Sequence, residues 1–353
     1  MFRSSLLAFT ALANALPQTT PIKGPGDNSL VRFGCSQVVI ERLDPLVNPG
    51  VNPSPHLHQI VGGNAFNASI PSSDVSELAT CTTCSFSEDF SNYWTANLYF
   101  KARNGTFKRV PQVPNRFLDG SQGGVTVYYL SPHKNSVTAF KPGFRMLFGD
   151  SMRRESKEGM DMQSCFRCFT GPNFEGDNYG PCGDPKLDTE SFPTGPCLGG
   201  IRSNIHFPTC WDGERLDSPN HQDHVAYPVG GPSSFATTGD CPSTHPVKIP
   251  QLMLEVVWNT TAFNNPSDWP EDGSQPFYLS TGDNTGYGQH ADYVFGWKGE
   301  ALQKLMDGAC FGDSCEGVLK QDFSEANKCS VPNTVDEITE GWLDQLPGDG
   351  SGA

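Results

Sequence analysis

Side chains that can take part in binding or catalysis are concentrated between residues 207 and 228, where they are, in order, Trp211, Asp212, His221, Asp223, His224 and Tyr227. Four of the eight histidines of the chain fall between residues 206 and 245. Imidazoles and carboxylates gather in this way either to hold a metal ion or to line a polar cleft in which protons move. This segment therefore predicts part of a functional site.

Two further groups of polar residues lie far from this segment. His56 and His58 occur in P-H-L-H-Q-I-V-G-G, and alternate residues of an extended chain point to the same face, so the two imidazoles can converge. A strand predicted at 276–280 leads into a glycine-rich loop, and loops at strand ends commonly carry function. We expect one cleft to collect residues from all three groups and from the strand 252–258, namely His56, His58, His224, Asp212, Glu255, Asp283, His290 and Asp292.

A divalent metal ion is one interpretation of the histidines. Both H-x-H on a strand and H-x-x-H on a turn permit shared coordination, although neither spacing is diagnostic. The candidate ligands are His56, His58, His221, His224, His245 and His290, with Asp292 beside them. The sequence does not require a cofactor, and a divalent metal is the one cofactor that it suggests.

Cleavage of a polysaccharide is a second interpretation. Hydrolysis of a glycosidic bond needs two carboxyl groups ~5–5.5 Å or ~6.5–9.5 Å apart, and the candidates are Asp89, Asp212, Glu255, Asp283 and Asp292. Elimination from a polyuronate would instead use a histidine and a tyrosine as proton carriers, with His224 and Tyr227 as the pair and His58 as a further candidate. Arg145 or Gln59 would then neutralise the substrate carboxylate.

A non-catalytic role in binding sugars or a cell wall remains as an alternative. Tyr93, Trp94 and Trp211 could stack on sugar rings, but aromatic residues of this kind are as often ordinary core. Any single histidine is more commonly a hydrogen-bonded interior side chain than a ligand. The enzyme and binding interpretations separate on whether polysaccharide is cleaved or only retained.

Charge excludes some partners. Residues 1–15 have the charged start, short apolar run and small-residue end of a signal peptide. Without them the chain has 23 basic residues (24 minus Arg3) against 39 acidic residues, a formal charge of −16. This charge opposes binding to nucleic acid or to an anionic membrane. We expect a secreted, extracellular monomer whose partner is a polysaccharide.

Cysteine usage supports the same destination. Twelve cysteines remain after residue 15, an even number that predicts disulfides in a secreted protein. The pairs Cys81/Cys84 and Cys165/Cys168 have zinc-ribbon spacing, but an oxidising compartment favours disulfides for them, bridged locally or to distant partners. Asn-x-Ser/Thr sequons that permit glycosylation occur at Asn67, Asn104 and Asn259.

The elements that must position these side chains are short strands with many Gly and Pro turns. Strands are predicted at 36–43, 96–101, 125–130, 143–149, 252–258 and 276–280, and one helix near 299–308. Glu255 lies alone in an apolar strand and must reach a cleft or a cationic partner. We expect an extended arm at 16–29, one all-β domain at 30–330, a disulfide-held excursion at about 157–200, and a tail at 331–353. The expected architecture is a two-sheet β-sandwich resembling a jelly roll.

Seven sequence blocks resemble a fungal secreted family that is known only as a domain of unknown function. They are P-H-L-H-Q-I-V-G-G-N-A-F, D-F-S-N-Y-W, F-R-M-L-F-G-D, F-P-T-C-W-D-G, H-V-A-Y-P, C-P-S-T-H-P and the T-G-D…H-A-D loop. The resemblance runs from about Arg32 to Asp307 and implies an extracellular fungal protein. It carries no assigned activity, so no catalytic role follows from it.

Overall fold

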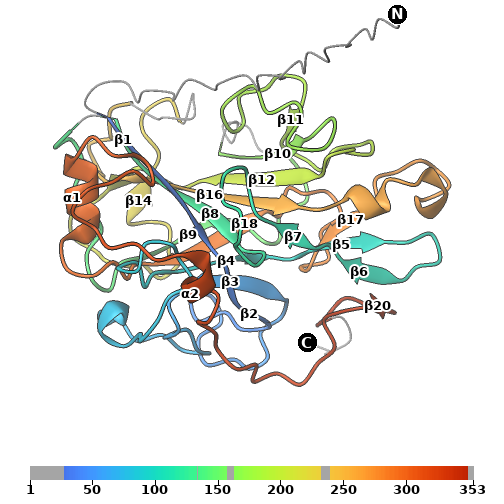
Figure 1. Cartoon of the computed structure of the whole chain (residues 1–353), viewed down its shortest axis with the longest axis horizontal. Coiled ribbons are helices and arrows are strands. Elements are labelled where there is room, and N and C mark those ends of the chain that lie inside the picture. The colour runs from blue at the N-terminus through green and yellow to red at the C-terminus, as the bar shows by residue number, and fades with distance from the viewer. Residues whose placement is uncertain (1–27, 133, 157–162, 232–238, 349–353) are drawn as a thin grey trace, which may run out of the picture.

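The computed structural model describes residues 28–132, 134–156, 163–231 and 239–348. Over these residues the chain is mostly β, with four sheets and two short α-helices, α1 (Ala301–Asp307) and α2 (Phe323–Ala326). Figure 1 shows α1 on one side of the molecule and the strands β5 (Leu98–Lys101), β6 (Phe107–Arg109) and β17 (Phe277–Leu279) on the opposite side. The predicted signal peptide and nearly all of the predicted arm lie outside the described residues.

The largest sheet has eight strands. Its strand β8 is rich in β-branched and aromatic residues and its strand β16 is largely apolar, and every residue of both is buried, as expected for central strands covered on both faces. The path through this sheet is β11 (Asp188–Thr189), β10 (Ser164–Cys168), β12 (Ile201–His206), β16 (Gln251–Trp258), β8 (Val125–Ser131), β1 (Ser29–Cys35) and β19 (Phe311–Gly312), with β7 (Gln112–Val113) paired to β16.

The five-stranded sheet positions the candidate site. Its strands are antiparallel and follow the order β2 (Gln37–Glu41), β3 (His58–Gly62), β4 (Asn92–Ala96), β18 (His290–Val294) and β9 (Arg145–Gly149). Because side chains alternate along a strand, His58 and Ile60 lie on one face of β3 and Gln59 on the other. The same alternation puts His290 and Asp292 together on the face that carries His58.

Two smaller sheets complete the β structure. The four-stranded sheet has the order β17 (Phe277–Leu279), β5 (Leu98–Lys101), β6 (Phe107–Arg109) and β20 (Trp342–Leu343). The three-stranded sheet has the order β14 (Val225–Ala226), β13 (Cys210–Trp211) and β15 (Val247–Lys248). Single 3-10 turns occur at Val75–Glu77, Thr261–Phe263 and Pro266–Asp268.

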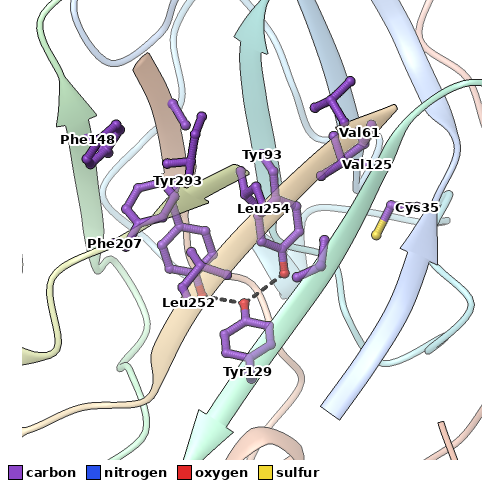
Figure 2. Packing of buried hydrophobic residues seen from close by; sticks show 14 of the residues in the cluster. Cys35, Val61, Tyr93, Val125, Tyr129, Phe148, Phe207, Leu252, Leu254 and Tyr293 are labelled. Carbon is purple, nitrogen blue, oxygen red and sulfur yellow. Dashed lines mark hydrogen bonds between the residues drawn. The ribbon is translucent and has the colours of Figure 1, made fainter. Parts of the chain in front are cut away.

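The main hydrophobic core lies between the two large sheets. Phe33, Tyr129 and Leu252 of the eight-stranded sheet belong to one buried cluster with Tyr93 and Tyr293 of the five-stranded sheet. The three tyrosine hydroxyls form a chain in this core, with 2.7 Å between Tyr93 and Tyr129 and 2.9 Å between Tyr129 and Tyr293 (Figure 2). The chain joins strands of both sheets and satisfies polar groups that would otherwise be unpaired in an apolar interior.

Asp89 ends the hydroxyl chain. Its Oδ2 accepts a hydrogen bond from the Tyr93 hydroxyl at 2.8 Å, and its Oδ1 accepts one from the backbone N–H of Ser91 at 3.0 Å. The carboxyl is fully buried, and burial raises its pKa to about 7. Asp89 was a candidate for carboxylate chemistry, but its contacts are those of a structural group in the core.

The opposite face of the five-stranded sheet is covered by the chain between β2 and β4. Ile60, Trp94 and Val294 form a second buried cluster there with Leu43 and Phe66. This covering segment includes the loop that carries His56. The candidate site therefore lies on the outer face of the sheet, away from the main core.

All twelve cysteines form disulfides, as predicted. Both C-x-x-C pairs bond to distant partners, so neither closes locally and neither is a zinc site. The six bonds are Cys35–Cys84, Cys81–Cys329, Cys165–Cys182, Cys168–Cys197, Cys210–Cys241 and Cys310–Cys315. They are consistent with the expected extracellular destination.

Several predicted elements need correction. A two-sheet jelly-roll sandwich is not shown, because the described residues form four sheets, of which the two largest pack around the main core. The strand predicted at 36–43 begins only at Gln37, after β1 has ended at Cys35. The segment 157–200 is not a pure excursion, since its strand β10 pairs within the largest sheet. The helix predicted near 299–308 is confirmed as α1.

No helix in the described part of the chain is long and apolar enough to cross a membrane.

Candidate functional site

Three histidines from separate parts of the chain meet at one end of the five-stranded sheet. His56 precedes β3, His58 begins β3, and His290 begins β18. Strand β4 runs between them, and its Ala96 is the direct cross-strand neighbour of His58. The pairing of β18 with β4 puts His290 on the other side of Ala96. Because Ala96 has only a methyl group, the two rings have room to approach each other.

The imidazoles are close enough to share a ligand. The Nε2 atoms of His56 and His290 lie 3.1 Å apart. The ring centre of His58 lies 4.3 Å from that of His56 and 5.7 Å from that of His290. One nitrogen from each ring lies within 4.8 Å of the other two. We call these three residues the three-histidine cluster.

Backbone carbonyls fix which nitrogens face the cluster. The Nδ1 of His58 lies 3.0 Å from the carbonyl oxygen of Leu43, and the Nδ1 of His290 lies 3.1 Å from that of Gly288. Because a carbonyl oxygen only accepts, Nδ1 must be the protonated nitrogen in both rings. Each neutral ring then has its lone pair on Nε2. The Nε2 of His58 is buried and has no hydrogen-bond partner.

Burial keeps these histidines neutral. It is the largest cause of the lowered pKa of each residue, and it lowers the pKa of His58 from 6.5 to about 4. Mutual repulsion adds to the effect on His56, whose pKa is lowered further by His58 and His290. Neutral imidazoles keep the lone pairs that metal coordination requires.

A cavity of about 550 Å³ opens beside the cluster and is lined by His56 and His290. Asp44 also lines it, and the Asp44 Oδ1 accepts hydrogen bonds from the backbone N–H groups of Leu46 and Val47 at 3.2 and 3.0 Å. Other polar lining residues are Asn48, Asp150, Ser151, Asn220, Gln222, Ser280 and Thr281. We call this space the first cavity.

Asp292 lies two residues beyond His290 on the same face, but it does not join the cluster. Both of its carboxyl oxygens are buried without a hydrogen-bond partner. Burial, aided by the charge of Asp44, raises its pKa well above the ordinary value. The Asp292 side chain therefore lies in surroundings that disfavour its charged form, beside Trp94, its cross-strand neighbour.

The second group of predicted histidines is not part of the cluster. The two ring nitrogens of His224 contact the Ser218 hydroxyl at 3.0 Å and the Arg145 carbonyl at 2.8 Å, so both are occupied by structural hydrogen bonds. His221 pairs with Asp217 at 2.6 Å. His245 contacts the backbone carbonyl of Asp223 at 3.1 Å on the surface. Within the described residues, none of these three belongs to a group of three or more side chains that could hold a metal ion.

Residues 211–227 hold local structure together. The Asp212 Oδ1 accepts hydrogen bonds from the backbone N–H groups of Glu214 and Arg215, both at 2.9 Å, and Asp212 forms an ion pair with Arg215. Trp211 is nearly buried and donates its indole N–H to the Arg215 carbonyl. The Tyr227 hydroxyl donates to the carbonyl of His206 at 2.6 Å. The structure thus does not bring Asp212 or Tyr227 to the cluster.

Glu255 has the cationic partner that its apolar surroundings demanded. Its Oε1 lies 3.4 Å from Arg202, and its Oε2 accepts hydrogen bonds from Asn115 at 2.7 Å and Tyr128 at 2.8 Å. Arg202 is bound in turn by Asp177 at 3.0 Å. Glu255 is on β16 of the eight-stranded sheet, so it belongs to a buried ion network and not to the cleft expected for it.

Asp283 shapes the loop that leads to His290. It accepts hydrogen bonds from the backbone N–H groups of Gly286 at 3.0 Å and Gly288 at 2.8 Å. The carbonyl of Gly288 is the group that orients the His290 ring. Asp283 therefore acts on the cluster indirectly, through the loop backbone.

The residues expected to bind substrate are buried. Tyr93, Trp94 and Gln59 are fully buried, which leaves no face of either ring for a sugar. The Gln59 side chain faces the main core and bonds to Thr95 at 3.0 Å. Arg145 donates to the carbonyl of Pro71 at 2.8 Å. These four residues position elements around the site.

Of the eight residues predicted to share a cleft, only His56, His58 and His290 form a common group, with Asp292 and Asp283 close by in sequence. Sequence reasoning missed Asp44, Asp150 and Gln222, which line the first cavity. Asp44 follows a predicted strand and precedes a proline, so it read as a turn residue. No signal in the sequence distinguished it from other surface carboxylates.

Comparison with known proteins gives a family but no activity. A family model described as a domain of unknown function, DUF1996, matches residues 44–297, which is more than half of the chain. The match covers all three residues of the three-histidine cluster. No curated protein and no solved structure matches the chain. The protein therefore belongs to the DUF1996 family.

Proposed function

We propose that this protein is a metal-dependent enzyme that hydrolyses a neutral cell-wall or plant polysaccharide outside the cell, as a monomer. The observation that carries the proposal is the convergence of His56, His58 and His290, with two of the three rings locked by backbone carbonyls. Metal-binding histidines usually donate their second ring nitrogen in this way, which fixes the tautomer and the ring orientation.

The spacing supports a small divalent ion. Zinc binds histidine nitrogens at about 2.0–2.1 Å in tetrahedral geometry, which separates two such nitrogens by about 3.3 Å. The 3.1 Å between the Nε2 atoms of His56 and His290 agrees with this value. The buried, unpartnered Nε2 of His58 would gain its missing partner from the same ion. We therefore assign the cluster to zinc.

Three protein ligands leave one position of the ion open. Catalytic zinc sites have this composition, and zinc supplies an activated water near neutral pH. His56 and His290 line the first cavity, so this position would face it. Asp44 is held in that cavity by two backbone N–H groups, and we assign it the role of proton acceptor.

The lining of the first cavity favours a neutral sugar. Amide and hydroxyl groups of Asn48, Ser280 and Thr281 can bond to sugar hydroxyls, while Val47 and Met152 offer apolar surface. The described residues that line it include two aspartates but no lysine or arginine. This charge disfavours a polyuronate, so we propose hydrolysis and not elimination.

The test combines metal binding with activity. Calorimetric titration of the metal-free protein with zinc should give one ion per chain. His290→Ala should weaken that binding by more than the ~10–100-fold caused by losing an outer-shell partner. His245→Ala is the matched control, because His245 lies on the surface outside the cluster and should leave zinc binding unchanged.

Activity is then measured on a panel of neutral wall polysaccharides. The zinc-loaded protein should release new reducing ends, a chelator should stop the release, and added zinc should restore it. Retention on a polysaccharide without release would instead identify a binding protein. Stoichiometric zinc binding that survives His290→Ala would reject the proposed site.

A further inference from the structure

The first cavity does not end at the three-histidine cluster. A second cavity of about 530 Å³ adjoins it, and we call this the second cavity. Both cavities are lined by the same four residues, which form the boundary between them: Leu147, Gly149, Asp150 and Gln222. Each volume falls within the range of small-molecule sites.

The boundary is formed by the end of β9 and one side chain of the neighbouring loop. The Nε2 of Gln222 donates to the carbonyl of Gly149 at 2.8 Å. Gly149 has φ +84° and approaches β18 so closely that a Cβ would lie 2.4 Å from the carbonyl oxygen of Gln289. The boundary is therefore a fixed backbone ridge with an amide on it, open to both cavities.

The second cavity offers the same mixed chemistry as the first. Its wall includes the ring of Tyr227, which is held by the hydroxyl contact to His206. Arg153 also lines it, but its charge is balanced by Glu190 at 3.4 Å. A ring for stacking beside hydrogen-bonding groups suits a sugar unit.

An extended peptide is a poorer occupant. Peptides commonly bind by adding a strand to a free sheet edge, and β9 is the edge strand beside the groove. Two of its outward N–H groups are already used, because the backbone N–H of Arg145 donates to the Leu216 carbonyl at 3.1 Å and that of Leu147 to the His221 carbonyl at 2.9 Å. This edge therefore offers little room for an added strand, and recognition is expected to come from side chains.

We propose that the two cavities form one groove that binds a neutral polysaccharide chain across the ridge of Gly149 and Gln222. The chain would be cleaved beside the three-histidine cluster, and the second cavity would be a distal subsite for units on one side of the cleaved bond. This inference rests on the proposed function. It adds the path of the substrate, which would run from the three-histidine cluster across the ridge into the second cavity.

The test uses the zinc-loaded protein and unbranched oligomers of glucose and of N-acetylglucosamine, from disaccharide to octasaccharide. Affinity is measured by calorimetry. It should rise at least ~10-fold once an oligomer is long enough to occupy both cavities, because each added subsite contributes favourable contacts. Ser156→Trp should fill the second cavity, since Ser156 is an exposed residue on its wall.

In Ser156→Trp the longer oligomers should bind no better than the short ones. Ser274→Trp is the matched control, because Ser274 is an exposed serine that lines a separate cavity beside β5 and β17. It should keep the full dependence on length. A length dependence that is absent, or that survives Ser156→Trp, would overturn the groove.

Zinc stoichiometry measured on the same samples separates the two proposals. Normal zinc binding without any oligomer binding would reject the groove and leave the metal site standing. Length-dependent oligomer binding without zinc would reject the metal-dependent enzyme and support the groove.

Discussion

At the scale of single residues, the main core contains an acid whose charge the fold opposes. Asp89 is fully buried, and its pKa is raised from 3.8 to about 7 by burial, although hydrogen bonds from Ser91 and Tyr93 oppose the shift. Between these values the folded protein holds a proton that the unfolded chain has lost. The contribution of Asp89 to stability therefore falls as pH rises from about 4 to about 7, and levels off above that.

Replacing Asp89 with Asn should remove this contribution. The side chain at position 89 of the variant stays neutral at every pH. As pH rises across this range, the free energy of unfolding of the variant, minus that of the wild type, should therefore increase by up to about 1.4 kcal/mol per pH unit. Urea denaturation of both proteins at several pH values measures the difference. Because only the difference is used, other titrating groups cancel. Parallel curves would show that Asp89 is ionised in the folded protein throughout.

Part of the three-histidine cluster could be predicted from the sequence. His56 and His58 were predicted to converge because alternate residues share a face, and the glycine-rich loop was predicted to supply His290. His221 and His224 were equal candidates by type and spacing. His224 is excluded from the three-histidine cluster because its ring bonds to the Arg145 carbonyl, 79 residues away in the sequence. Such a long-range contact leaves no local signal.

At the scale of elements, the C-terminal segment 331–348 braces the loop that carries His56. It runs below β2 and β3 toward β20 in Figure 1. Glu337 binds Arg42 with both oxygens, at 2.9 and 2.8 Å, and Arg42 donates to the carbonyl of Ser54 at 3.0 Å. The Ser54 hydroxyl donates to the carbonyl of His56 at 3.1 Å. This path connects the segment to His56, one of the three proposed zinc ligands.

Glu337→Gln should therefore weaken zinc binding by up to about 10-fold, the lower end of the effect of an outer-shell loss. Glu340→Gln is the matched control. Glu340 lies in the same C-terminal segment, but it pairs with Arg109 on β6 and not with Arg42. Zinc affinity and melting temperature are measured for both variants. Equal zinc affinities in the two would contradict the bracing role.

Elements with strong composition were predictable and the others were not. Strand β8 is a run of mostly β-branched and aromatic residues, and strand β16 is largely apolar and ends in Val-Val-Trp, so their prediction needed no tertiary information. Strand β3 carries the polar residues His58 and Gln59, and no strand was predicted there. Its position follows from pairing with β2 and β4, which is a tertiary effect.

At the scale of the whole molecule, β content and complete disulfide pairing followed from composition, but the arrangement did not. Dense Gly and Pro turns predicted short strands without specifying how many sheets they form. The largest sheet joins strands as distant as β1 and β16, and four sheets result in place of two. The three-histidine cluster depends on the register between β3, β4 and β18, which only the assembled fold determines.

The zinc assignment is tested most directly by an anomalous difference map at the zinc edge, from crystals of the zinc-loaded protein. We expect one strong peak per chain, about 2.0–2.1 Å from the Nε2 atoms of His56, His58 and His290, with its remaining coordination position toward the first cavity. A map with no peak among these three nitrogens, or with its peak at another site, would contradict the central claim.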